Sequence, residues 1–138
     1  MPGFFDFFGF GSRRRTAIQV LDQALDDNEV NRAYIDDGMR FAIYKWAEES
    51  ARGGTPDQVL KDAAALVSFC VLGKAETAAL WGETVAAERD ARFAAVLANG
   101  EDDTFDARII KLVLAKGNAA EDIRARVNLE SVSLESEG

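Results

Sequence analysis

The stretch that decides the fold is TPDQVLKDAAALVSFCVL, residues 55–72. Thr55 is a typical helix N-cap, Pro56 suits the first helical position, and Gln58 can reach back to the cap. From Val59 to Leu72, apolar residues cover nearly the whole circumference of the predicted helix. A helix with so little polar surface is usually covered by other elements on several sides. We therefore expect this segment to be the central helix of the core.

Two helices are predicted on the N-terminal side of this segment. Apolar residues at helical spacing predict a helix from about Arg14 to Asp26, capped by Ser12 or a neighbour. Asp26 followed by Glu29 matches a capping box, which predicts that a second helix starts there. The pair Gly53-Gly54 is expected to end that helix. Its predicted apolar stripe consists of Ile35, Met39, Ala42, Ile43 and Trp46.

On the C-terminal side, Gly73 predicts a break in the helix. A single helix from Pro56 to Asn99 would be about 65 Å long, whereas a compact domain of this size has a radius of gyration of about 14 Å. Three helices are predicted beyond the break: residues 75–98, about 105–117 after an acidic turn at 101–104, and a short helix that opens with the capping box 118–121.

The fold class predicted from these patterns is all-α, a single compact helical domain of about six helices with no convincing strand. Residues 1–12 are predicted to form a Phe-rich N-terminal arm. Residues 13–129 are assigned to the helical domain, and residues 130–138 to an acidic flexible tail.

Charge is distributed unevenly along the chain. The 138 residues carry a formal net charge of −8, which argues against nucleic-acid binding because phosphate neutralisation needs clustered Lys and Arg. Residues 1–16 contain three arginines and one aspartate, so they carry +2 and the remaining residues carry −10. An acidic body of this kind favours a neutral or basic protein partner.

The residue types that carry common chemistries are missing or have a structural interpretation. The chain has no histidine, which removes the commonest general base and most zinc and iron sites. The lone Cys70 lies in an apolar run, so we interpret it as a small core residue of a reducing, cytoplasmic compartment. Ser68 is expected to bond a backbone carbonyl, and Trp46 and Trp81 to lie in the core. We predict no enzyme activity, no cofactor and no metal site.

The candidate site is the aromatic start of the chain together with the basic run after it. Each phenylalanine favours burial by roughly 2 kcal/mol. Three interpretations remain open: the arm covers the chain's own surface, inserts into an anionic membrane interface, or docks into a groove on a protein partner or a second copy. The predicted partner- or membrane-binding residues are Phe4, Phe5, Phe7, Phe8, Phe10, Arg13, Arg14 and Arg15.

Part of this segment resembles a known family. Phe5-Asp6-Phe7-Phe8, followed by Ser12-Arg13-Arg14-Arg15-Thr16, is similar to the start of the cell-division topological factor family MinE. In that family an apolar segment with Asp-Phe-Phe and a basic patch precedes a helix. The resemblance implies a membrane-targeting role for this segment. It ends at Ala17, and it implies nothing about the remaining chain, because that family is short and partly β.

The predicted function is that of a non-enzymatic, cytoplasmic helical binding or adaptor protein. Its N-terminal arm and the adjacent arginines form the contact element for a protein partner, a second copy or an anionic membrane surface. The alternative is an acidic inhibitor or immunity-type protein. In that case a basic partner binds the acidic helix faces at Asp36-Asp37 and Glu48-Glu49.

Overall fold

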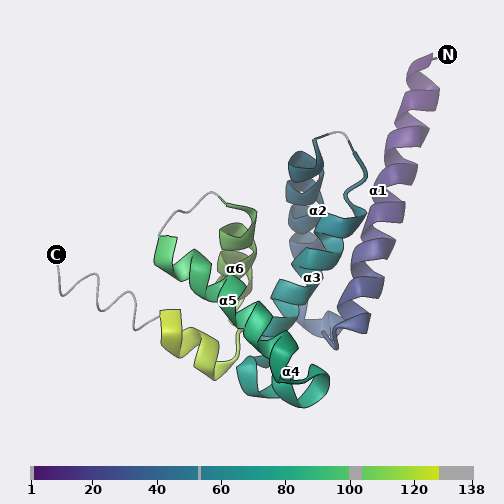
Figure 1. Cartoon of the computed structure of the whole chain (residues 1–138). Coiled ribbons are helices and arrows are strands. Elements are labelled where there is room, and N and C mark those ends of the chain that lie inside the picture. Colours follow the sequence, from purple (N-terminus) through teal and green to yellow (C-terminus); the bar gives the residue numbers. More distant parts are fainter. Residues whose placement is uncertain (1, 53, 100–103, 128–138) are drawn as a thin grey trace. The chain divides into compact units, whose positions relative to one another are not determined.

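The computed structural model describes residues 2–52, 54–99 and 104–127, and it describes side chains from Arg15 onward. This part of the chain is helical and contains no strand, which confirms the predicted all-α class (Figure 1). Its elements are α1 (Pro2–Asp27), the 3-10 helix η1 (Arg32–Tyr34), α2 (Asp37–Ala51), α3 (Asp57–Leu72), α4 (Lys74–Trp81), α5 (Glu83–Asn99) and α6 (Phe105–Ala115). Residues 121–127 are also helical.

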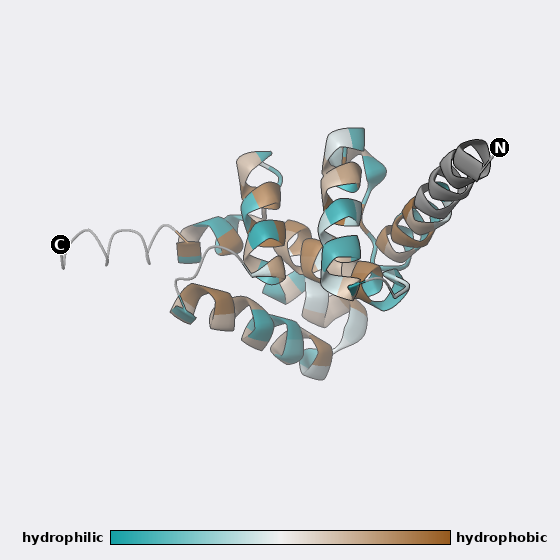
Figure 2. Cartoon of the chain, turned by 90° about the horizontal axis from the view of Figure 1, so that it is seen from above, coloured by the Kyte–Doolittle hydropathy of each residue, from teal (hydrophilic) through white to brown (hydrophobic). Residues whose placement is uncertain are grey.

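The chain divides into two compact units, residues 1–64 and residues 65–138. The boundary falls inside α3, so one helix supplies residues to both units. The described helices carry hydrophobic and hydrophilic residues side by side along their length (Figure 2). The single domain over 13–129 stays a prediction, and the tail at 130–138 lies outside the described residues.

In the first unit, α1 packs against α2 and the two helices run in opposite directions (Figure 1). The buried apolar residues come from α1, the connection after it, α2 and the first half of α3. They are Ala17, Leu21, Ala24, Leu25, Val30, Ile35, Met39, Ile43, Tyr44, Ala47, Leu60, Ala63 and Ala64. Burial of Ile35, Met39 and Ile43 confirms the centre of the predicted stripe, whereas Trp46 is only half-buried.

Both predicted starts in this unit differ from the structure. The helix predicted from Arg14 begins at Pro2 and contains three glycines. Two of them, Gly9 and Gly11, are at interior positions, where each costs about 1 kcal/mol. The helix predicted at Asp26 begins instead at Asp37, and Asp36 caps it by accepting a hydrogen bond from the Met39 amide at 2.8 Å. Between the helices the chain turns at Glu29, whose φ of 60° is left-handed. The apolar anchors of this connection are Val30 and Ile35.

The central segment forms α3 as predicted. It begins at Asp57, one residue after the expected position, and the Leu60 amide donates to the Pro56 carbonyl at 2.8 Å. Its second half supplies much of the second unit's core, where the rings of Phe69 and Phe93 lie 5.8 Å apart. The buried apolar residues of this unit are Leu66, Val67, Phe69, Cys70, Ala86, Phe93, Ala107, Ile109, Ile110, Val113, Ala119 and Ile123.

Two glycines break the helices that follow. Gly73, with φ 87°, ends α3 as predicted. The prediction of a single helix over 75–98 is wrong, because Gly82 adopts φ 96° and separates α4 from α5. The Gly82 amide closes α4 on the Ala78 carbonyl at 2.8 Å, and its own carbonyl accepts from Ala86 at 3.2 Å. Helical periodicity of the apolar residues continues through this break, so periodicity alone did not indicate it.

The last described helix is attached to the earlier part of its unit by polar contacts. An Asp122 carboxylate oxygen accepts a hydrogen bond from the Lys74 amide at the start of α4, at 3.1 Å. The Ala120 amide donates to the Cys70 carbonyl at 2.8 Å. Arg126 pairs with Asp90, and its guanidinium carbon lies 4.8 Å from the centre of the Phe93 ring. The Asp122 contact completes the N-terminus of α4 from a distant part of the sequence, and the other contacts join the last helix to α3 and α5.

None of the described helices is by itself both long enough and apolar enough to cross a membrane. Only α3 and α4 taken together meet that test, and the chain bends by 119° between them.

Candidate functional site

The predicted site residues belong to the first four turns of α1. Phe4, Phe5, Phe7, Phe8, Phe10, Arg13 and Arg14 lie within its bounds, but their side chains lie outside the described part of the structure. Arg15 is the first described side chain and is exposed. The role of these phenylalanines and arginines in binding therefore stays a prediction. What the structure adds is a helical backbone that joins the arm to the packed part of α1.

An ion pair sets the register of α1 against α2. Arg40 Nη1 donates to both carboxylate oxygens of Asp22 at 3.1 Å, and its Nη2 donates to Asp37. The hydrogen bonds to Asp37 and Asp22 raise the pKa of Arg40. Because antiparallel helices rise equally per residue, this pairing places Ala51, the last residue of α2, level with about Gly11. The helix α1, with 26 residues, therefore extends past the C-terminal end of α2, which has 15 residues.

The described part of α1 also borders a pocket of about 460 Å³ within the first unit. Gln19, Val20 and Gln23 of α1 line it on one side and Lys61 of α3 on another. The Asp27 carboxylate is the single acidic group in this lining of described residues. The lining thus combines glutamine amides and apolar atoms with one carboxylate and one ammonium group.

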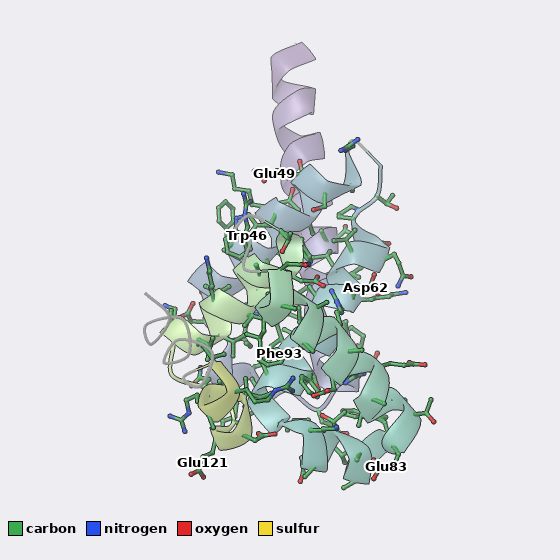
Figure 3. All side chains as sticks on the ribbon, turned by 60° about the vertical axis from the view of Figure 1, so that its left-hand side comes forward. Trp46, Glu49, Asp62, Glu83, Phe93 and Glu121 are labelled. Atoms are coloured by element: carbon green, nitrogen blue, oxygen red, sulfur yellow. The ribbon has the colours of Figure 1, made fainter. Side chains whose placement is uncertain are left out.

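The acidic pairs of the alternative hypothesis have different environments. Asp36 caps α2, and Asp37 pairs with Arg40, so both have local structural partners. Glu48 and Glu49 are exposed on α2, and Figure 3 shows Glu49 near the end of that helix. Helix capping explains Asp36, since Asp is a usual N-cap residue, and the ion pair with Arg40 explains Asp37.

Sequence reasoning missed one cluster in the second unit, formed by Trp81, Arg89 and Ser68. The Arg89 guanidinium carbon lies 4.7 Å from the centre of the Trp81 ring, and its Nη1 donates to the buried Ser68 hydroxyl at 3.5 Å. Burial, and then the nearby charge of Arg92, lower the pKa of Arg89. Trp81 is half-buried, so the core prediction for it is only partly right. Only the fold-back of α5 after Gly82 brings Arg89 to this ring.

Two groups that could carry chemistry, the Cys70 thiol and the Arg92 guanidinium, are respectively inaccessible and engaged. Cys70 is buried, and burial raises its pKa to about 12 against the opposing charge of Arg92. Arg92 forms a two-point ion pair with Asp106, with nitrogen–oxygen distances of 2.8 and 2.7 Å. Among the described side chains, no group of three or more His, Cys, Asp or Glu residues could hold a metal ion.

Comparison of the chain with family models, with curated proteins and with solved structures finds no significant match. Any function proposed for it must therefore rest on its own residues.

Proposed function

We propose that this chain is a non-enzymatic, cytoplasmic binding protein whose N-terminal arm and adjacent arginines form its contact element. The occupant of that element is a protein partner, which includes a second copy of the chain, or an anionic membrane surface. Nucleic acid is excluded from the proposal because of the net charge of −8.

The observation that carries the proposal is the difference in length between α1 and α2. Residues before about Gly11 extend past the level of the last residue of α2, when the register is taken from the Asp22–Arg40 pair. Five of those residues are phenylalanines. Aromatic anchors next to Arg are the residue types enriched at protein contacts. The same composition suits an anionic interface, where each basic residue contributes about 1 kcal/mol.

A deletion of residues 2–10 tests the proposal. We expect the thermal unfolding midpoint to stay within about 2 °C of that of the full chain, because an arm used for external contact contributes little to its own fold. A large drop in the midpoint would mean that the phenylalanines pack on the chain itself, and the proposal would be wrong.

Flotation then identifies the occupant. The full chain and the deletion variant are mixed with phosphatidylglycerol-containing vesicles and with neutral phosphatidylcholine vesicles. Flotation of the full chain with anionic vesicles alone assigns a membrane surface. A matched variant, R13Q/R14Q/R15Q, should lose this preference while keeping all five phenylalanines. If no form floats, the arm contacts protein, and sedimentation of the full chain and the deletion variant shows whether a second copy is bound.

A further inference from the structure

An apolar surface lies at the corner between α4 and α5, in the second unit. Leu80 is 45% exposed although it is a large aliphatic residue, and Trp81 beside it is half-buried. Both belong to the last turn of α4, which ends at Gly82. We call these two residues the Leu80–Trp81 corner. Large exposed apolar side chains next to each other are a common feature of protein contact sites.

The Trp81 ring is held in place from within its own unit. The Arg89 guanidinium lies over it, and Arg89 also reaches the buried hydroxyl of Ser68. A cation over an indole ring is the most favourable pairing of this type. An aromatic side chain fixed before binding loses less conformational entropy on binding, which favours affinity.

Three glutamates lie near this corner in the sequence, one on α4 and two on α5. Glu76 lies one turn before Leu80 on the same face of α4, Glu83 opens α5 just after Gly82, and Glu88 is adjacent to Arg89. All three are exposed, and Figure 3 shows Glu83 at the periphery of the ribbon. In the described part of the chain none of them forms an ion pair.

Two aspartates of the same unit, unlike these glutamates, form ion pairs. Asp90 pairs with Arg126, and Asp106 pairs with Arg92. The three glutamates therefore leave uncompensated negative charge around an apolar centre, with Arg89 covering the ring. Such a field attracts a positively charged partner and repels an anionic one.

We propose that the Leu80–Trp81 corner docks a cationic amphipathic segment of another protein. An apolar side chain of that segment lies on Leu80 and the open part of Trp81, and its Lys or Arg residues face Glu76, Glu83 and Glu88. This surface is separate from the N-terminal arm and does not depend on the function proposed for it. It is also distinct from the acidic pairs on α2.

A labelled model peptide tests this proposal with the full chain. The probe is an 18-residue helical peptide with Leu on one face and Lys on the other, and its binding is followed by fluorescence anisotropy at low salt. Leu80→Ala should weaken binding about fivefold, since an apolar anchor is removed. The triple variant E76Q/E83Q/E88Q should weaken it about tenfold and flatten its salt dependence.

The matched control changes the same number of charges elsewhere. E29Q/D57N/E121Q replaces three exposed carboxylates outside the corner and should alter the affinity less than twofold. Equal weakening by the two triple variants would mean that the peptide senses only the net charge, and the proposal would be overturned. So would equal binding of a peptide with Glu in place of Lys, or an unchanged affinity of Leu80→Ala. Far-UV circular dichroism confirms that each variant is folded.

Discussion

At the scale of single residues, Cys70 combines complete burial with a perturbed thiol. Its side chain is 0% exposed, and burial raises its pKa from 9.0 to about 12. Since the thiolate is the reactive form, a thiol held neutral in this way is a poor nucleophile at neutral pH. The residue therefore acts as a small apolar side chain in the core of the second unit.

This environment predicts a pH-dependent stability. Below about pH 9 the thiol is protonated in the folded and the unfolded state, so it adds no pH dependence. Between about pH 9 and 12 the unfolded state loses the proton while the folded state keeps it, and the free energy of unfolding falls by up to about 1.4 kcal/mol per pH unit. Urea denaturation at several pH values measures this slope.

The control for this prediction is Cys70→Ala, which lacks the titrating group. The difference in slope between the two proteins isolates the thiol from lysines and tyrosines that also titrate at high pH. A thiol reagent at pH 8 gives a second measurement, because the folded chain should react far more slowly than the urea-unfolded chain. Fast labelling of the folded chain would contradict the assignment of Cys70 to the core.

At the scale of elements, two glycines with similar backbone angles have different surroundings. Gly73 has φ 87° and ψ 171°, and Gly82 has φ 96° and ψ 166°. A Cβ at Gly73 would lie 2.5 Å from an Asp122 carboxylate oxygen, whereas one at Gly82 would meet nothing within 4 Å. The pair thus separates backbone strain from a steric clash.

We predict that Gly82→Ala lowers the free energy of unfolding by about 2 kcal/mol, which is the cost of its backbone conformation alone. Gly73→Ala should lower it by about 3 to 4 kcal/mol, because Asp122 is also displaced from the Lys74 amide. Urea denaturation followed by circular dichroism measures both values.

A double-mutant cycle with Asp122→Ala supplies the control. In the unmodified chain this change should cost about 1 kcal/mol, since it removes the carboxylate from the first turn of α4. In the Gly73→Ala background it should cost nothing, because the clash has already broken that contact. Equal costs in both backgrounds would show that Asp122 and position 73 are not coupled.

The start or end of a helix could be predicted from the sequence where the residues that determine it are close to it in the chain. The start of α3, the break at Gly73, and the Thr104 cap of α6, which accepts from the Ala107 amide at 3.1 Å, follow from nearby residues. The start of α2 does not, because a buried connection with Val30 and Ile35 replaces the expected capping box.

The features of the candidate surfaces that the sequence did not indicate depend on contacts between residues that are distant in the chain. Arg89 reaches Trp81 only because α5 folds back on α4, and no local pattern marks that geometry. The register of α1 on α2 likewise depends on Arg40 meeting Asp22, 18 residues away. By contrast, the aromatic and basic composition of the N-terminal arm could be read directly from the sequence, because composition does not depend on the fold.

At the scale of the whole molecule, each compact unit contains one tryptophan. Trp46 lies in residues 1–64 and Trp81 in residues 65–138. The 16-residue helix α3 runs through the boundary and contributes buried residues on both sides of it. A continuous helix can fray at its ends far more easily than it can melt in the middle.

We therefore predict that the two units unfold together. Trp46→Phe leaves Trp81 as the fluorescent reporter of the second unit, and Trp81→Phe leaves Trp46 as the reporter of the first. In each variant, the urea midpoint measured by tryptophan fluorescence should equal the midpoint measured by circular dichroism. Ala65→Pro interrupts α3 at the boundary, at a cost of about 3 kcal/mol, and should separate the two midpoints when combined with each variant. Separate midpoints without the proline would show that the units are independent.

The Asp122 contact at the start of α4 also bears on how the chain is made. Its carboxylate joins Lys74 across 48 residues of sequence. At a translation rate of about 5–20 residues per second, a ribosome needs roughly 2 to 10 s to add those residues. During that interval α4 leaves the exit tunnel without the group that completes its first turn. A nascent chain stalled before Asp122 is therefore expected to expose α4 to chaperones and proteases, and one extended well beyond it to be protected.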